Sequence, residues 1–202
     1  MSHLSVAVSK AHTTKQQIIQ KAAVVFNQQG YAGTSMSDIM QATGLKKGGL
    51  YNHFSSKDEL ALAAFDFAVG SIVEQYRTAL RGKRHSISRL KAVIETFCAL
   101  VHTVKGGCPL MNMAVESDDT HPALCDRTRQ AMDIWRQMLE KIINLGIKHQ
   151  ELQSSLDAAR VTTILISTLE GALMLSQLYQ DTSHIGWAKQ HLLDYLETLR
   201  RT

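Results

Sequence analysis

Apolar residues recur at every third or fourth position along almost the whole chain, which is the spacing of amphipathic α-helices. Two prolines, Pro109 and Pro122, interrupt this pattern, and no segment shows the alternation typical of a β-strand. We therefore expect an all-α protein of about nine helices. Breaks between them are expected at residues 30–33, 44, 55–56, 81–83, 105–107, 117–122, 150–155 and 181–183.

The helix expected at residues 161–179 is apolar around its whole circumference, unlike a helix on a protein surface. It must therefore be buried on both sides. We expect one side to pack on its own bundle and the other, with small residues such as Ser167, Gly171 and Ser176, on a second copy of the chain. The alternative is the central helix of a monomeric bundle. A membrane span is not expected, because Glu170 and several hydroxyl residues interrupt the stretch.

The last helix, expected from about residue 185 to 199, repeats this apolar pattern. Together the two helices predict a homodimer, in which two identical surfaces meet around a twofold axis. The residues predicted to form the dimer interface are Ile164, Thr168, Gly171, Ala172, Leu175, Trp187, Leu192, Tyr195 and Leu196.

Residues 34–60 carry the strongest local signals in the chain. Ser35 and Asp38 have the spacing of a capping box, which predicts a helix start, and Gly44 predicts its end in a left-handed conformation. A second helix is expected over residues 46–54. Two helices joined by a short turn containing glycine form the helix-turn-helix unit that reads DNA. A further helix is expected to start at Lys57, after a serine cap.

Many of these residues match a known pattern in type and spacing. The positions are Thr34-Ser35-Met36, Asp38-Ile39, Gly44-Leu45, Gly48, Leu50-Tyr51, His53-Phe54 and Ser56-Lys57, preceded by Thr13, Ile18, Ala22-Ala23, Phe26 and Gly30-Tyr31. In this pattern the segment 13–60 resembles the N-terminal domain of the TetR family of repressors. A shorter likeness to some family members lies in Gly107-Cys108-Pro109-Leu110 with Glu116.

The resemblance implies a three-helix DNA-binding domain at residues 1–60, ordered from about residue 13, and a helical effector-binding and dimerisation domain at residues 61–202. In the family the last two long helices form a four-helix dimer interface, in agreement with the pattern above. The implied partners are a palindromic double-stranded DNA operator, a small-molecule effector and a second copy of the chain. No cofactor, metal or membrane is expected, and a repressor is favoured over an activator.

Helix geometry indicates which residues would contact DNA, because the N-terminal part of the recognition helix faces base edges and its flanks meet phosphate. The expected DNA-binding residues are Thr34, Ser35, Lys46, Lys47, Gly48, Gly49, Tyr51, His53 and Lys57. For each, a solvated charge, a cap or a buried structural role is the alternative. Lys46 departs from the family, which often has a capping Ser or Thr there, and Gly48 and Gly49 weaken the helix by roughly 1 kcal/mol each relative to alanine. The recognition helix is therefore expected to become firm only on DNA.

The charge distribution changes this picture only slightly. The formal net charge is +4 at pH 7. Residues 1–60 contain six lysines and three acidic residues, or +3, whereas the remainder holds 16 basic and 15 acidic residues, or +1. The positive charge is therefore concentrated in the segment proposed to meet phosphate.

The middle helices carry apolar residues that could line an effector cavity, although ordinary core packing would use the same residue types. The candidates are Phe97, His102, Cys108, Met111, Met113, Trp135, Met138, Glu170 and Met174. Cys108 could also be a thiol sensor of reactive species, because it lies in an apparently open glycine loop with Lys105 nearby to favour the thiolate. An inert, packed cysteine is the alternative.

Two other classes of protein are alternatives to a DNA-binding regulator. An enzyme would need a nucleophile, a base and an orienting group, and no local motif joins the candidates His102, Cys108, Glu116 and His121. The second alternative is a helical interaction module, whose DNA affinity would barely depend on Tyr51 or Lys47. Three cysteines without close pairs and the absence of a signal-peptide pattern favour the cytoplasm.

Overall fold

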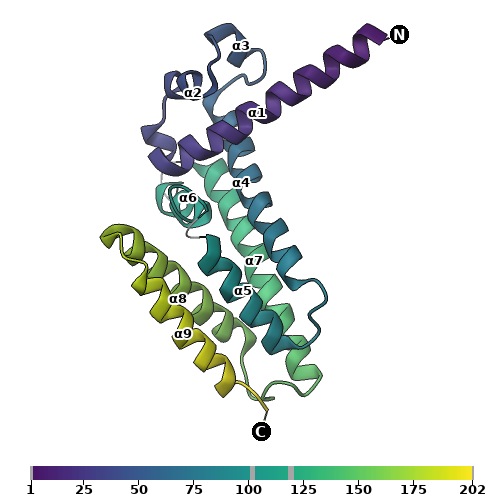
Figure 1. The fold of residues 1–202 in the computed structure, drawn as a ribbon, viewed down its shortest axis with the longest axis vertical. Helices are drawn as coiled ribbons and strands as arrows, with labels where there is room; N and C mark the ends of the chain where they lie inside the picture. Colours follow the sequence, from purple (N-terminus) through teal and green to yellow (C-terminus); the bar gives the residue numbers. More distant parts are fainter. Residues whose placement is uncertain (1, 101–102, 118–120, 202) are drawn as a thin grey trace.

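The computed structural model describes residues 2–100, 103–117 and 121–201, with side chains described from Thr13 onward. In this part of the chain it contains nine α-helices and no β-strand (Figure 1). They are α1 (Ser2–Gly33), α2 (Met36–Thr43), α3 (Lys47–Tyr51), α4 (Lys57–Leu80), α5 (Ser86–Leu100), α6 (Pro109–Ser117), α7 (Pro122–Lys148), α8 (Ala158–Tyr179) and α9 (Ser183–Thr198). The all-α fold with an N-terminal helix-turn-helix and a C-terminal bundle is thus confirmed.

The N-terminal head consists of α1, α2, α3 and the first turns of α4. Its core is formed by large apolar side chains that are almost completely buried: Ile18, Phe26, Ile39, Leu50, Phe54 and Leu60. The helical path of α1 breaks at Gly30, which has a φ of 77° and lies in the expected break at residues 30–33. Several bounds differ from expectation: α1 begins at Ser2 rather than near residue 13, α3 ends at Tyr51 rather than at residue 54, and α8 and α9 begin two or three residues earlier than expected.

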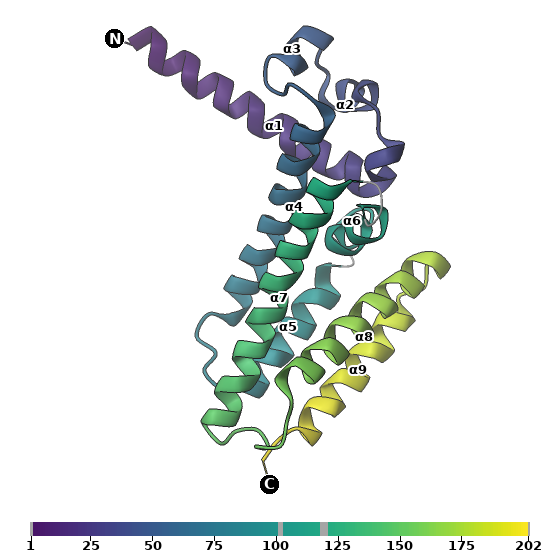
Figure 2. The ribbon, with the colours of Figure 1, turned by 180° about the vertical axis from the view of Figure 1, so that it is seen from behind.

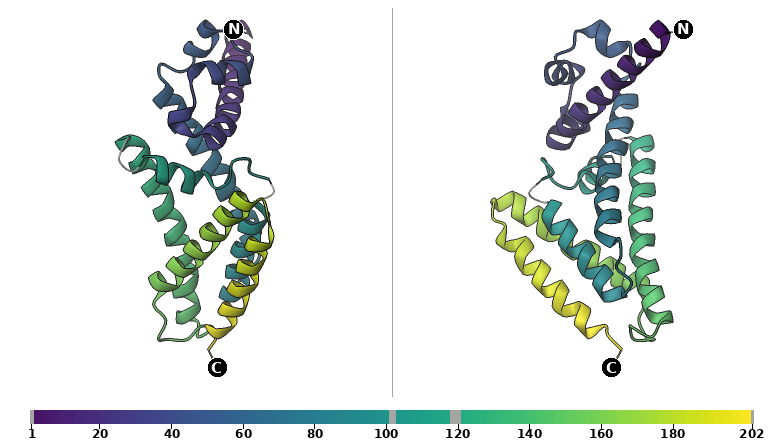
Figure 3. Two further views of the ribbon diagram at one scale, coloured as in Figure 1. Left: turned by 90° about the vertical axis from the view of Figure 1, so that its left-hand side faces the viewer. Right: turned by 45° about the vertical axis from the view of Figure 1, so that its right-hand side comes forward.

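The C-terminal bundle is built from α4 to α9, and α4 belongs to both parts of the molecule (Figures 1 and 2). The domain boundary expected at residue 60 therefore falls within a continuous helix. In the two views of Figure 3, the head lies at the end of the molecule opposite the C-terminus. Helices α8 and α9 run side by side along one flank of the bundle.

Helix α8 has one face inside its own bundle and one face outside. Leu165, Leu169 and Leu173 are buried, whereas Met174 and Leu178 are exposed. By length and composition the segment Ala158–Tyr179 could cross a membrane, and half of its apolar window is buried inside the protein, as in the core helix of a globular protein. Of the two faces of this helix that were expected to be buried, one is therefore buried within the protomer itself.

Burial within the protomer corrects three of the predicted interface residues: Ala172 on α8, which packs into the bundle core, and Leu192 and Leu196 on the amphipathic helix α9. Leu192 and Leu196 are completely buried against the protomer's own core. They hold α9 on the bundle and have no surface left for a second copy. By contrast, Trp187 is 67% exposed.

Candidate nucleic-acid interface and effector cavity

Hydrogen bonds close to each turn set the geometry of the helix-turn-helix. The Ser35 hydroxyl accepts from the backbone N–H of Asp38 (3.2 Å), and the Asp38 carboxylate accepts from the backbone N–H of Ser35 (2.7 Å). Gly44 ends α2 in the left-handed conformation, with a φ of 73°, and donates its N–H to the Met40 carbonyl (2.9 Å). The predicted capping box and glycine stop are therefore confirmed.

Helix α3 turns most of its surface to solvent. Within it only Leu50 is buried, while Lys47, Gly48 and Tyr51 are exposed. The Lys47 ammonium lies 5.9 Å from the centre of the Tyr51 ring. Lys46 occupies the N-cap position without a side-chain hydrogen bond, as expected for lysine. The helix and its N-cap residue thus present two lysines, a phenol and exposed glycine backbone to solvent.

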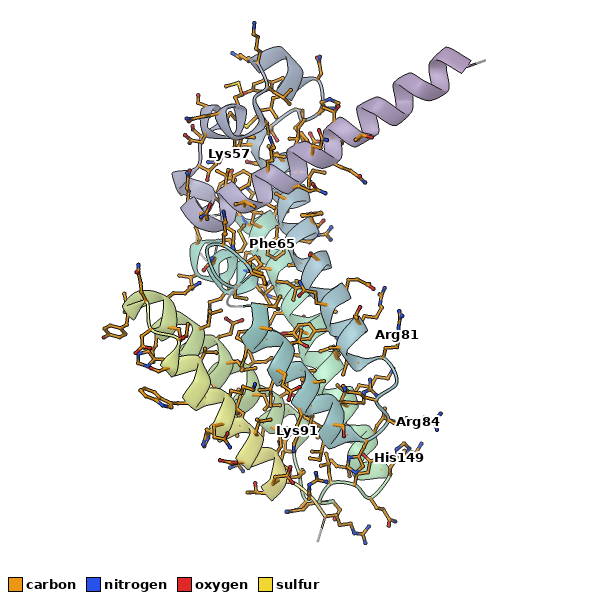
Figure 4. The ribbon with its side chains drawn as sticks, viewed as in Figure 1. Lys57, Phe65, Arg81, Arg84, Lys91 and His149 are labelled. Carbon is orange, nitrogen blue, oxygen red and sulfur yellow. The ribbon has the colours of Figure 1, made fainter. Side chains whose placement is uncertain are left out.

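The first turn of α4 adds a further positive charge to the head. Ser56 caps the helix by accepting from the backbone N–H of Glu59 (3.1 Å). The Lys57 ammonium lies 4.3 Å from the centre of the Tyr31 ring, a distance typical of a cation–π contact. Figure 4 shows Lys57 in the head, far from Arg81 and Arg84. A lysine next to the free amides of a helix N-terminus suits an anion such as a DNA phosphate.

The Tyr31 hydroxyl fixes the ring that holds Lys57. It donates a hydrogen bond to the Asp58 carboxylate. Burial, with a further contribution from Asp58, raises the pKa of Tyr31 to about 12. The phenol therefore remains a hydrogen-bond donor throughout the physiological pH range.

The head is joined to the bundle through α6 and the loop before it. The Glu116 carboxylate accepts from the backbone N–H groups of Tyr31 and Ala32, both at 2.6 Å. The Asn27 side chain donates to the carbonyls of Lys105 (2.7 Å) and Gly107 (2.9 Å), and Asn112 donates to Asn27 and to Gly106. We call these contacts of Asn27, Asn112, Glu116 and residues 105–107 the head–α6 junction.

A cavity of about 130 Å³ lies in the bundle among residues of α4, α5, α6, α7 and α8. Its walls are apolar almost throughout. Three aromatic side chains stack at one wall: the Trp135 ring lies 5.9 Å from that of Phe97 and 6.4 Å from that of Tyr76. Val73 and Ile134, from α4 and α7, are exposed residues on its solvent side.

Both the head and the C-terminal bundle match known protein families. The family model "Bacterial regulatory proteins, tetR family" matches residues 18–64, and the model "Tetracyclin repressor-like, C-terminal domain" matches residues 86–192. The crystal structure of a TetR transcriptional regulator from Chloroflexus aurantiacus J-10-FL has a TM-score of 0.91 at 39% identity, covering 96% of this chain and 98% of that one. The chain belongs to the TetR family.

Named relatives within the TetR family include regulators of both directions. The transcriptional repressor DhaR of Mycobacterium sp. (strain GP1) is 23% identical over 167 residues, which is 79% of this chain and 80% of DhaR. The transcriptional activator FasR of Mycolicibacterium smegmatis is 40% identical over 81 residues, which is 40% of this chain and 37% of FasR. This TetR-family chain is therefore a helix-turn-helix transcription regulator.

The structure corrects one of the predicted DNA contacts of this TetR-family head. Thr34 is buried, and its hydroxyl donates to the Gly30 carbonyl at 2.6 Å. It closes the turn after α1 and cannot reach a phosphate. The exposed predicted contacts are Ser35, Lys46, Lys47, Gly48 and Tyr51. Of the others, Gly49 lies on α3, His53 follows it, and Lys57 is the first residue of α4.

The predicted effector residues fall into two groups. Phe97, Cys108, Trp135 and Met138 line the cavity. Four others are not part of its wall: Met111, Met113, Glu170 and Met174, of which Met174 is exposed on the outer face of α8. His102 lies outside the described residues.

Sequence reasoning missed the contribution of α4 to this TetR-family cavity. Val69, Ile72, Val73 and Tyr76 line it from that helix. Their spacing of three and four residues is that of a helix face turned toward a partner. The signal was present in the sequence, but α4 was expected only to link the two parts.

The thiol environment is opposite to the one predicted for a reactive cysteine. Burial raises the pKa of Cys108 well above its usual value, and the neighbouring Glu170 carboxyl adds to the rise. The expectation that nearby charges favour the Cys108 thiolate is therefore wrong. All three cysteines are free. Among the described residues, no group of three or more His, Cys, Asp or Glu side chains could hold a metal.

Proposed function

We propose that this TetR-family regulator is a cytoplasmic repressor that binds a palindromic operator as a homodimer and is released by a small molecule bound non-covalently in the cavity. The outward surface of α3 and Lys57 carries this proposal. It combines cations, a phenol and bare glycine backbone on the short helix that follows the turn. These are groups that contact bases and phosphates in helix-turn-helix proteins.

The outer faces of α8 and α9 support the homodimer. Leu178, Tyr179 and Trp187 are each about two-thirds exposed, and Met174 is 55% exposed. The centre of the His184 ring, on α9, lies 5.7 Å from that of Tyr179 on α8 and 5.4 Å from that of Trp187 on α9. The contact with Tyr179 joins the two helices on this side. A contiguous apolar surface of this kind marks a protein–protein contact. Ile164, Thr168, Gly171 and Leu175 belong to the same helix and remain predicted interface residues, as does Tyr195 on α9.

The head–α6 junction supports release by an effector. Gly107, Pro109 and Leu110 line the cavity, and the same segment carries hydrogen-bond partners of the head. A ligand that moves α6 would move Glu116, which holds the backbone of Tyr31 and Ala32. The proposed coupling is a rigid-body shift of the head relative to its copy in the dimer. A thiol-modifying effector is not favoured, because the Cys108 thiol is kept protonated.

The test is selection of genomic DNA fragments by the purified protein, followed by sequencing. The parent protein is expected to enrich a palindromic sequence. Leu178→Glu places a charge in the proposed interface and is expected to yield a monomer in sedimentation that no longer enriches the palindrome. Glu74→Gln, an exposed change elsewhere, serves as the control. Enrichment without a twofold sequence, or a monomeric parent, would refute the proposal.

A further inference from the structure

The size of the cavity limits what it can hold. Its volume is about 130 Å³. An apolar cavity of about 150 Å³ holds benzene, so this volume matches a molecule with one aromatic ring. The stacked rings of Tyr76, Trp135 and Phe97 form an aromatic wall against which such a ring can pack.

An unpartnered carboxyl group lies beside this cavity. Glu170 is only 2% exposed, and neither of its carboxyl oxygens has a hydrogen-bond partner among the described residues. It lies on α8 one turn before Leu173, and Leu173 lines the cavity. Leaving a buried polar group without a partner is costly, so such a group in a native protein calls for a partner.

Cys108 is the cavity-lining residue that lies next to Glu170. It lines the cavity, and its thiol is close enough to Glu170 for each group to affect the pKa of the other. A thiol is a weak hydrogen-bond donor, and no contact of normal hydrogen-bond geometry joins the two groups. A ligand with a stronger donor could therefore take its place beside the carboxyl after rotation of one short side chain.

We infer that the cavity binds a neutral molecule with one aromatic ring and a single hydrogen-bond-donating hydroxyl, a phenol, whose hydroxyl donates to Glu170. The inference rests on the proposed role of this cavity as the effector site and names the class of effector. A protonated amine fits less well, because its remaining N–H groups would have no acceptor in the apolar walls. A carboxylate ligand would meet the carboxyl of Glu170 and be repelled.

The test is isothermal titration of the full-length protein with phenol, toluene, benzylamine and benzoate at pH 7.5. Phenol is expected to bind at least about tenfold more tightly than toluene, in the range expected for one hydrogen bond to a charged group. It is also expected to bind more tightly than benzylamine and benzoate. Equal affinity for phenol and toluene, tighter binding of either charged ligand, or no binding of phenol at millimolar concentration would overturn the inference.

Three variants separate a role for Glu170 from general packing. Glu170→Leu removes the acceptor and is expected to reduce the preference for phenol over toluene to less than about threefold. Cys108→Ser gives Glu170 an internal hydroxyl donor and is expected to reduce the preference as well, whereas Cys108→Ala is expected to keep it. An unchanged preference in Glu170→Leu would overturn the inference. Thermal melting of each variant checks that it folds.

Binding of phenol and binding of DNA are measured separately, so the two proposals can fail separately. If phenol binds with the predicted preference but leaves DNA affinity unchanged, the ligand site stands and its role as the effector site is refuted. If the protein binds a palindrome and phenol does not bind, the ligand class is refuted and the DNA-binding function stands.

Discussion

The head and the cavity differ in how their polar groups are satisfied. In the head, the polar side chains at the turns find partners within three or four residues, as Ser35 does with Asp38 and Ser56 with Glu59. Around the cavity, buried polar atoms of Trp135 and Glu170 have no partner among the described residues. The turns of the head are thus completed by local hydrogen bonds, and its exposed lysines face outward. In the described part of the chain, the buried polar atoms around the cavity still lack hydrogen-bond partners, which a ligand could supply.

The largest expected effect lies on the cavity side of this comparison. Burial raises the pKa of Glu170 from 4.5 to about 7, so the folded state holds a proton that the unfolded state has lost between these values. Below pH 4.5 the group does not reduce the free energy of unfolding. As the pH rises from 4.5 through 7, the free energy of unfolding falls by about 3 kcal/mol in total. Glu170→Gln is expected to remove this loss. Denaturant unfolding at pH 5 and pH 8 measures it.

The matched control for that experiment is Glu74→Gln, because Glu74 is exposed. It should leave the pH dependence of the parent unchanged. The free energy of unfolding of Glu170→Gln is compared with that of the parent at each pH. If the difference is no larger at pH 8 than at pH 5, the carboxyl is not buried without a partner, and the contrast with the head fails.

On the head side, Lys47→Ala is expected to weaken operator binding by about 100-fold, or about 2.7 kcal/mol, because a dimer loses two contacts. The slope of log affinity against log salt should fall by about two if both contacts are to phosphate. Fluorescence anisotropy with the selected fragment measures both quantities. Lys83→Ala is the control, because Lys83 is exposed in the loop between α4 and α5, and its neighbours Arg81 and Arg84 lie far from the head (Figure 4). An equal loss in both variants would indicate only general electrostatic attraction.

The junction between the two regions is tested by Glu116→Ala. This change leaves the backbone N–H groups of Tyr31 and Ala32 without their acceptor, and is expected to lower the free energy of unfolding by about 2 kcal/mol. Operator affinity should also change, since the head loses its fixed attachment. Denaturant unfolding and anisotropy are the measurements. Glu74→Ala, whose ion pair with Arg77 is exposed, should change stability by less than about 0.5 kcal/mol. Similar effects of the two changes would argue against the junction.

Gly48→Ala gives the smallest expected effect and sharpens the role of the glycines in α3. A Cβ at this position meets no atom within 4 Å, so alanine is expected to stabilise the free helix by about 1 kcal/mol or less. If the glycine serves close approach to DNA, operator affinity should fall although the head becomes more stable. Melting temperature and anisotropy together separate the two effects, with Gly33→Ala, which is equally unhindered, as the control. A gain in both quantities would assign the glycine no role on DNA.

The features readable from the sequence are those specified locally. The ends of α2 follow from Ser35, Asp38 and Gly44, because caps and left-handed glycines act through hydrogen bonds to near neighbours. The positions of the helix breaks follow from the same chemistry. For this reason the number and order of helices in the described part of the chain could be predicted closely.

Features that depend on contacts between distant helices could not be read in the same way. Thr34 looked like a phosphate contact, but the turn after α1 directs its hydroxyl to Gly30. Leu192 and Leu196 looked like dimer contacts, but the rotation of α9 about its axis places them inside. Cys108 looked open in a glycine loop, but packing around that loop leaves it only partly exposed and raises the pKa of its thiol. Helical spacing shows that a residue shares a face with others, and only packing decides what that face meets.

The most direct test of the proposed twofold regulator is the mass and affinity of its complex with the selected palindrome and with one half-site. Two protomers are expected on the full palindrome, and removal of one half-site is expected to lower affinity by at least about 100-fold. Native mass spectrometry gives the stoichiometry and anisotropy the affinity. A single protomer that binds the palindrome and the half-site equally well would contradict the account.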